Sequence, residues 1–104
     1  MNQQAMLRKV RQMQKEMMDT QKEIENTEFT ATSNVVTVVV MGTKEIKSVI
    51  IDPDFEVEDK EDLEMLSDMI VAASAIAYRD IEKTIEVKMG KYQALLGGMG
   101  GGLF

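Results

Sequence analysis

Apolar side chains in the first quarter of the chain recur at spacings of three, four and seven residues, as on one face of a helix. This stripe consists of Met6, Val10, Met13, Met17 and Ile24, with Thr20 at the missing step. The segment is built from good helix formers and contains no Gly or Pro. The pattern predicts a helix over about residues 3–26, with a heptad-like stripe that needs a partner surface.

From Glu28 onward the spacing changes to two, which is typical of strands. Ser33-Asn34 offers a short turn, and the β-branched run Val35–Met41 predicts a central strand. A third strand is expected at Ile46–Ile51, and Pro53 follows its end because proline cannot donate to a ladder. The short connections predict an antiparallel meander of three strands.

A second apolar stripe with three-and-four spacing predicts a helix over about residues 60–88 that frays near Gly90. Its members are Leu63, Leu66, Ile70, Ala73, Ala77, Ile81 and Ile85. The expected fold is therefore α+β, with the order α-β-β-β-α, in one domain spanning residues 1–104. We expect a flexible Gly-rich tail at about residues 97–104, although Leu103 and Phe104 offer an alternative, which is docking against an apolar groove.

Apolar residues occur on both faces of the central strand and around most of the second helix between Met69 and Tyr78. One chain of this size has too few elements to cover them, so we predict an intertwined homodimer. The residues expected at its interface are Met6, Val10, Met13, Met17, Ile70, Ala73 and Ala77.

The composition removes several kinds of chemistry. The chain has no His and no Cys, which excludes imidazole catalysis, thiolate nucleophiles, thiolate-bound zinc and disulfides. Its polar start lacks the apolar segment of a secretory signal, and no stretch is long enough to span a bilayer, so we expect a cytoplasmic protein without a membrane partner. An enzyme is the least favoured class, and we expect no cofactor, no metal and no small-molecule substrate.

An acidic run lies between Asp52 and Glu64. It fails as a calcium loop, because Val57 and Leu63 occupy the positions where an EF-hand requires Gly and Glu. A carboxylate-based hydrolase would rest on this run alone. We interpret the acids instead as residues that complement the start of the second helix.

The formal net charge is −6, yet the first fifteen residues carry +4 and no acid. Arg8, Arg11, Lys15 and Lys22 share one helical stripe opposite the apolar one. More cations follow near the end of the second helix. These faces are either solvated helix surfaces or contacts for the phosphates of a nucleic acid duplex.

The order of these segments resembles the YbaB/EbfC family of bacterial nucleoid-associated proteins. The resemblance rests on the Met/Gln/Lys-rich helix, Val35–Met41, Val49–Pro53 and the acidic start Asp59–Leu66 leading into Ile70–Ala73, and on the Gly- and Met-rich end. The chain departs from many relatives at Ser33-Asn34, where they have a Gly-rich turn, and at Ser74–Ala77, where they carry Asn-Asp-Ala.

The resemblance implies a tweezer-like homodimer that binds double-stranded DNA with little sequence preference and acts in nucleoid organisation and gene regulation. By region, it places DNA contacts on Arg8, Lys9, Arg11, Lys15, Arg79, Lys83, Lys88 and Lys91. The alternative is a non-enzymatic adaptor dimer that binds another protein and has weak or no DNA binding.

Overall fold

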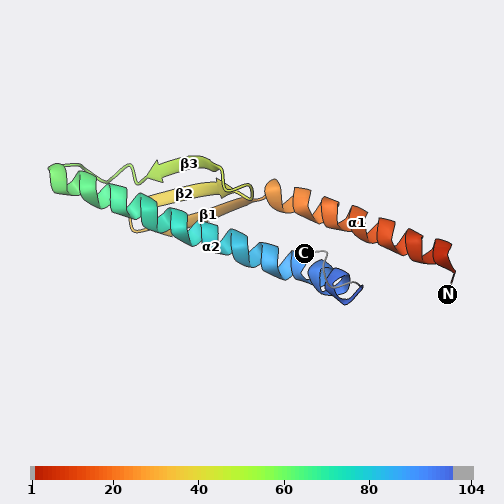
Figure 1. Cartoon of the computed structure of the whole chain (residues 1–104). Coiled ribbons are helices and arrows are strands. Elements are labelled where there is room, and N and C mark those ends of the chain that lie inside the picture. Colours follow the sequence, from red (N-terminus) through yellow and green to blue (C-terminus); the bar gives the residue numbers. More distant parts are fainter. Residues whose placement is uncertain (1, 100–104) are drawn as a thin grey trace.

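The computed structural model describes the backbone of residues 2–99 and the side chains of residues 2–95. Its elements follow in the order α1 (Gln3–Glu25), β1 (Glu28–Ser33), β2 (Val36–Met41), β3 (Ile46–Ile51) and α2 (Lys60–Met99) (Figure 1). The predicted α+β class and the α-β-β-β-α order are confirmed.

The three strands form one antiparallel sheet in the order β1-β2-β3, so β2 is central as predicted. Ser33 pairs with Val36, which leaves Asn34 and Val35 as a two-residue loop, one residue later than the predicted turn. Asn34 has a φ of 54°. Asparagine tolerates this left-handed conformation better than most residues because its short side chain can bond locally to the backbone.

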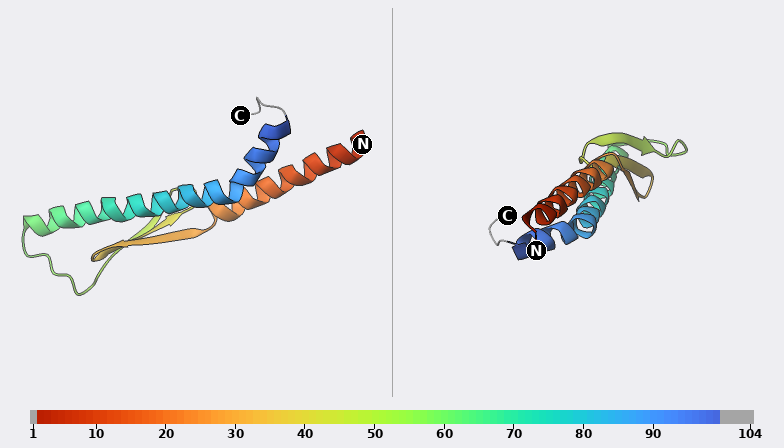
Figure 2. Two further views of the ribbon diagram at one scale, coloured as in Figure 1. Left: turned by 90° about the horizontal axis from the view of Figure 1, so that it is seen from below. Right: turned by 90° about the vertical axis from the view of Figure 1, so that its right-hand side faces the viewer.

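The core lies between α2 and the β1-β2 part of the sheet (Figure 2). Alternate residues of β2 point into it, so Val36, Val38 and Val40 are fully buried, whereas their neighbours on the other face are partly exposed. The buried face of α2 includes Ala73 and Ala77, whose small side chains let the helix backbone come close to the strands. At this surface, every second residue of β2 therefore packs against every third or fourth residue of α2.

The acidic run forms the start of α2, as the sequence analysis expected. The carboxylate of Asp59 accepts a hydrogen bond from the backbone N–H of Asp62, at 3.0 Å, and that of Asp62 accepts from the N–H of Glu58, at 2.9 Å. The first bond satisfies a backbone donor that the first helical turn leaves free, and the second ties the residue before Asp59 to that turn. The acids thus have a structural function at this helix terminus.

Helix α2 is longer than predicted and continues through Gly90 to Met99. A glycine inside a helix costs only about 1 kcal/mol relative to alanine, and Tyr92, packed beside α1, is buried on the far side of it. Residues 97–99, which the sequence analysis assigned to a Gly-rich tail, are helical. Residues 100–104 lie outside the described part of the chain.

The molecule is elongated, because both helices extend beyond one end of the sheet (Figure 1). Its radius of gyration is 20.2 Å and its dimensions are 72 × 22 × 14 Å. A compact domain of this length would have a radius of gyration of roughly 13 Å. Much of α1 is therefore supported only along one side, by the second half of α2.

Where α1 leads into the sheet, the backbone passes close to the turn after β2. The N–H of Gly42 donates to the carbonyl oxygen of Thr27 at 3.0 Å. A Cβ atom built on Gly42 would lie 1.7 Å from the carbonyl oxygen of Ile24, in the last turn of α1. Only glycine leaves room for this approach. We refer to Ile24, Thr27 and Gly42 as the α1 junction.

The turn after β2 is also fastened to α2. Lys44 has a φ of 74°, and the hydroxyl of Tyr78 donates to its carbonyl oxygen at 3.4 Å. The Lys44 ammonium forms an ion pair with Glu82. The same turn therefore contacts α1 through Gly42 and α2 through Lys44, which relates the two helices to each other.

We expect Gly42→Ala to lower the free energy of unfolding by about 1–3 kcal/mol or more, because the added methyl group forces the end of α1 away from the turn. Urea denaturation followed by circular dichroism at one fixed protein concentration measures this change. Gly90→Ala is the matched control, because a Cβ at Gly90 meets no atom within 4 Å. It should stabilise the protein by about 0.5–1 kcal/mol, and equal midpoints for wild type and Gly42→Ala would contradict the role of the junction.

Candidate nucleic-acid interface

The first helix presents an exposed face of positive charge. Arg8, Lys9, Arg11 and Lys15 are all exposed, and the first turn of the helix contains no acid. Arg8 and Lys15 are seven residues apart, so their positions span roughly 10 Å of helix axis. One strand of B-DNA presents a phosphate about every 3.4 Å along its axis, so this face is long enough to meet several phosphates.

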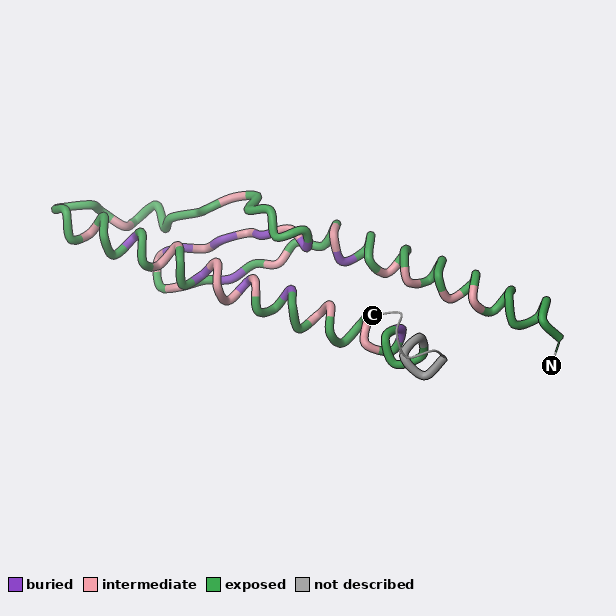
Figure 3. The backbone as a smooth tube through the Cα atoms, viewed as in Figure 1, coloured by how far each residue is buried: buried purple, intermediate pink, exposed green. Residues whose placement is uncertain are grey.

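The orientation of this face follows from the apolar stripe on the other side of α1. From Val10 on, each member of that stripe is less exposed than the residues around it, and Ile24 at its end is buried (Figure 3). The remaining members of this less exposed row are Met13, Met17 and Thr20. The stripe faces α2, because Val10 and Met13 line a groove together with Tyr92 and Leu95. The opposite face, with Arg8, Arg11 and Lys15, is thereby turned toward solvent.

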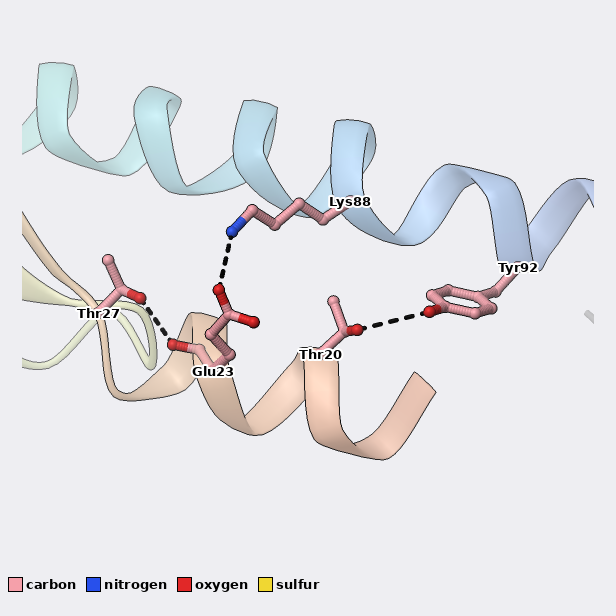
Figure 4. A network of polar contacts seen from close by, with 5 residues as sticks. All are labelled: Thr20, Glu23, Thr27, Lys88 and Tyr92. Carbon is pink, nitrogen blue, oxygen red and sulfur yellow. Dashed lines mark hydrogen bonds and ion pairs between the residues drawn. The ribbon is translucent and has the colours of Figure 1, made fainter. Parts of the chain in front are cut away.

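Close to α1, the second half of α2 makes specific polar contacts with it (Figure 4). The ammonium of Lys88 lies 3.2 Å from a carboxylate oxygen of Glu23, and the hydroxyls of Thr20 and Tyr92 are 3.5 Å apart. Both side chains of the ion pair are largely exposed, so its contribution to stability is about 0.2–1 kcal/mol. Lys88 therefore already has a partner within the chain.

The predicted cations of α2 do not form a single surface. The ammonium of Lys91 lies 4.9 Å from the centre of the Tyr92 ring, and Lys91 lines the same groove as Lys9. Arg79 and Lys83 are exposed but belong to neither this groove nor the contact with Glu23 among the described residues. The structure thus places Lys88 and Lys91 together beside α1 and leaves Arg79 and Lys83 apart from them.

The residues predicted for a dimer interface also fall into different places. Ala73 and Ala77 are fully buried within the single chain, so they have no surface left for a second copy. Ile70 packs against the same core. Met6, Val10 and Met13 line the groove beside α2. The first half of the apolar stripe of α1 therefore faces the end of α2 across an open groove.

Sequence reasoning missed two residues that position α1. Tyr92 is only 4% exposed and packs beyond the point where the second helix was expected to end. Tyr92 lies eleven residues after Ile81, and Leu95 lies three residues further on. This continuation of the helical spacing could have predicted that the second helix extends past Gly90. Gly42 directly follows the predicted strand Val35–Met41, and nothing in its neighbourhood in sequence indicates the close approach of Ile24.

Among residues 2–99, no helix is long and apolar enough to cross a membrane. Within that same range, no three acidic side chains gather in a way that could hold a metal ion.

Two long helices, a three-stranded antiparallel sheet and a cationic face on the projecting first helix define a small α+β protein with a surface suited to a polyanion. The chain belongs to the YbaB/EbfC DNA-binding family, whose model matches residues 1–97. The family resemblance seen in the sequence is confirmed.

Proteins named nucleoid-associated protein are similar to this chain over most of its length. One from Lachnospira eligens is 49% identical over 86 residues, covering 81% of this chain and 72% of that protein. One from Lactococcus lactis subsp. cremoris is 43% identical over 94 residues, covering 88% and 93%. One from Roseiflexus is 43% identical over 100 residues, covering 95% of each.

Because Tyr92 is buried beside α1, we expect Tyr92→Ala to loosen the projecting part of that helix. Amide hydrogen exchange in residues 3–20 should become faster, whereas exchange in β2 should change little. Tyr92→Phe is the control, because it keeps the ring and removes only a hydroxyl whose contact with Thr20 is long at 3.5 Å. Equal exchange in wild type and Tyr92→Ala would show that the ring does not hold α1.

Proposed function

We propose that this protein is a non-enzymatic, nucleoid-associated homodimer that binds duplex DNA mainly through phosphates and with little sequence preference. The observation that carries the proposal is the exposed face of α1, where Arg8, Arg11 and Lys15 stand without an acid among them. Membership of a DNA-binding family and the names of the relatives support it. A role in nucleoid organisation and gene regulation, within the cytoplasm, follows from this proposal.

The side chains on this face favour phosphate contacts over base readout. Arg and Lys on an exposed helix can reach backbone oxygens, and such contacts position a protein without reading sequence. No aromatic residue lies between these cations in the sequence, so stacking on unpaired bases has no platform here. Low sequence preference is the expected result.

The net charge of −6 does not oppose this binding mode, because the charges are separated in space. The acidic start of α2 and the N-terminus of α1 lie at opposite ends of a molecule 72 Å long (Figure 1). The Debye length is about 8 Å at physiological ionic strength. Screening therefore weakens repulsion between the acids and DNA that is bound at α1.

For the dimer we propose the β3 side of the sheet as the interface, in place of the buried alanines. Since α2 covers β1 and β2, it leaves β3 at an uncovered edge. Four large apolar side chains of β3 are between 40% and 51% exposed, namely Ile46, Val49, Ile50 and Ile51. An apolar edge strand of this kind is a ready surface for pairing with another chain.

The one charge on β3 does not protect this edge. Lys47 forms an ion pair with Glu28 of β1, so its charge is partly compensated within the sheet. Lysines on edge strands commonly discourage pairing. With Lys47 engaged, the edge of β3 offers mainly apolar surface and free backbone groups to a second copy.

Replacing a phosphate contact should reduce the salt dependence of DNA binding. The logarithm of the binding constant falls by about 0.9 per contact for each unit of log salt concentration, so Lys15→Glu, present twice in a dimer, should lower the slope by roughly two. Fluorescence anisotropy with a labelled duplex at several salt concentrations measures this slope.

Lys60→Glu is the matched control, because it makes the same change in net charge at the acidic start of α2. Its slope should equal that of the wild type. Equal slopes for Lys15→Glu and wild type would place the contacts elsewhere, and no binding of wild type at low salt would favour the adaptor alternative.

We expect Ile50→Lys to dissociate the dimer, because it places a charge on the edge strand β3, on the face of the sheet that α2 does not cover. Sedimentation at micromolar concentration should give about twice the chain mass for wild type and the mass of one chain for the variant. Thr30→Lys on β1, at the other edge of the sheet and on the same face as Ile50, is the control and should remain dimeric. A monomeric wild type would reject the dimer, and a dimeric Ile50→Lys would reject this interface.

A further inference from the structure

The apolar face of α1 that is turned toward α2 carries two methionines within reach of solvent. Met6 and Met13 line an open groove of about 560 Å³ together with Val10, Tyr92 and Leu95. We call this hollow the α1–α2 groove. Met6 also lines a second hollow with Val10, and it is 49% exposed. Thioether groups are therefore accessible to small solutes at the place where the two helices face each other.

Methionine is the only sulfur-containing residue of this chain, which has ten methionines and no Cys. An oxidant that attacks sulfur here therefore produces methionine sulfoxide rather than a disulfide or a sulfenic acid. The sulfoxide turns a flexible apolar side chain into a polar one, and dedicated reductases reverse the change. Sulfur oxidation in this protein thus acts on apolar packing.

The first half of α1 depends on apolar packing more than the second half does. Among the described residues, the side-chain hydrogen bonds and ion pairs that join α1 to α2 occur at Thr20 and Glu23, in the second half of the helix. Nearer the N-terminus, Val10 and Met13 are partly buried and face the end of α2 across the groove. The position of this part of α1 is therefore set by apolar side chains.

We propose that a peroxide releases the first half of α1 from α2 by oxidising Met6 and Met13, and that reduction of the two sulfoxides restores the arrangement. A sulfoxide oxygen accepts hydrogen bonds from water and is costly to bury beside Tyr92. The α1 junction and the ion pair between Lys88 and Glu23 are untouched, so the helix pivots there and stays joined to the sheet. The proposal rests neither on DNA binding nor on the dimer.

The reaction with hydrogen peroxide needs no group of the protein except the thioether. The sulfur lone pair attacks one peroxide oxygen, so that an S–O bond forms as the O–O bond breaks. The proton of the attacked oxygen passes to the departing oxygen, which leaves as water. Each sulfur loses two electrons and the peroxide gains them.

Met18 provides a control within the same helix. It is 58% exposed, so a peroxide reaches it at least as readily as Met6. It lies outside the apolar stripe, about 100° around the helix from Met17. Its sulfoxide remains in water whether or not α1 packs toward α2. Oxidation of Met18 should therefore leave the position of α1 unchanged.

Amide hydrogen exchange before and after peroxide treatment of the full chain tests the proposal, and peptide mass spectrometry locates the added oxygen atoms. Exchange in residues 3–14 should become roughly fourfold faster, which corresponds to the lost burial of about one methylene group. Methionine sulfoxide reductases should restore the original rate. The increase should persist in Met18→Leu and disappear in the double variant Met6→Leu and Met13→Leu, because leucine keeps the apolar volume without a thioether.

Several results of this experiment would overturn the proposal. One is unchanged exchange after Met6 and Met13 have been oxidised, and another is an equal increase in the double leucine variant. Oxidation of Met18 that leaves Met6 and Met13 intact also overturns it, because the groove then excludes the oxidant. So does an equal acceleration in β2, which indicates unfolding of the whole domain rather than release of one helix.

A second pair of variants needs no oxidant. Glutamine resembles methionine sulfoxide in length and polarity, so Met13→Gln should accelerate exchange in residues 3–14 by a similar factor. Met18→Gln, with the same change on another face of the helix, should leave exchange there as in the wild type. Equal rates for the two glutamine variants overturn the proposal, even where the leucine variants fail to fold.

Discussion

The close approach of Gly42 to the last turn of α1 is the constraint on which the rest of the arrangement depends. Helix α1 has only one fully buried residue, Ile24, and it lies at this junction. From there the helix projects for more than five turns with support along one side only. A small change of angle at the junction therefore becomes a large displacement at the N-terminus, which makes the missing Cβ at Gly42 matter for the position of distant cations.

The same junction explains why the cationic face points outward. Once the end of α1 is fixed by Gly42, the helical period places Val10, Met13 and Met17 toward α2. The cations, about half a turn away, are then exposed without any specific interaction to hold them there. The electrostatic face of this protein is thus a consequence of apolar packing on its opposite side.

Much of the fold could be predicted from the sequence, because the period of apolar residues changes from three and four to two and back again. The limits were set by effects that act across distant parts of the chain. Gly90 suggested a helix end, but Tyr92 packs beside α1, and this tertiary contact outweighs the local cost of glycine. Val10 and Met13 indicated an apolar face correctly, yet no spacing indicates whether its partner is the same chain or another.

For the candidate site too, local features could be predicted from the sequence, whereas contacts between distant segments could not. Clustering of cations before Glu16 is visible in the sequence because helix α1 is local, so Arg8, Arg11 and Lys15 fall on one exposed face. The cations of α2 were grouped by proximity in sequence, whereas Lys88 turns toward Glu23, 65 residues earlier. Ion pairs between residues that are distant in sequence decide which charges remain available for a ligand, and the composition does not reveal these pairs.

Two copies of the cationic α1 face in one dimer would bind DNA more strongly than a single copy. Three phosphate contacts from one α1 give a salt slope of about 2.7, and two copies acting together give about 5.4, because the contributions of released counterions add in the logarithm of the binding constant. A single chain would bind DNA weakly, and its apolar β3 would remain in water. In the proposed dimer, association through β3 would cover that surface and join two α1 faces in one particle, so the same interaction would bury apolar surface and raise the affinity for DNA.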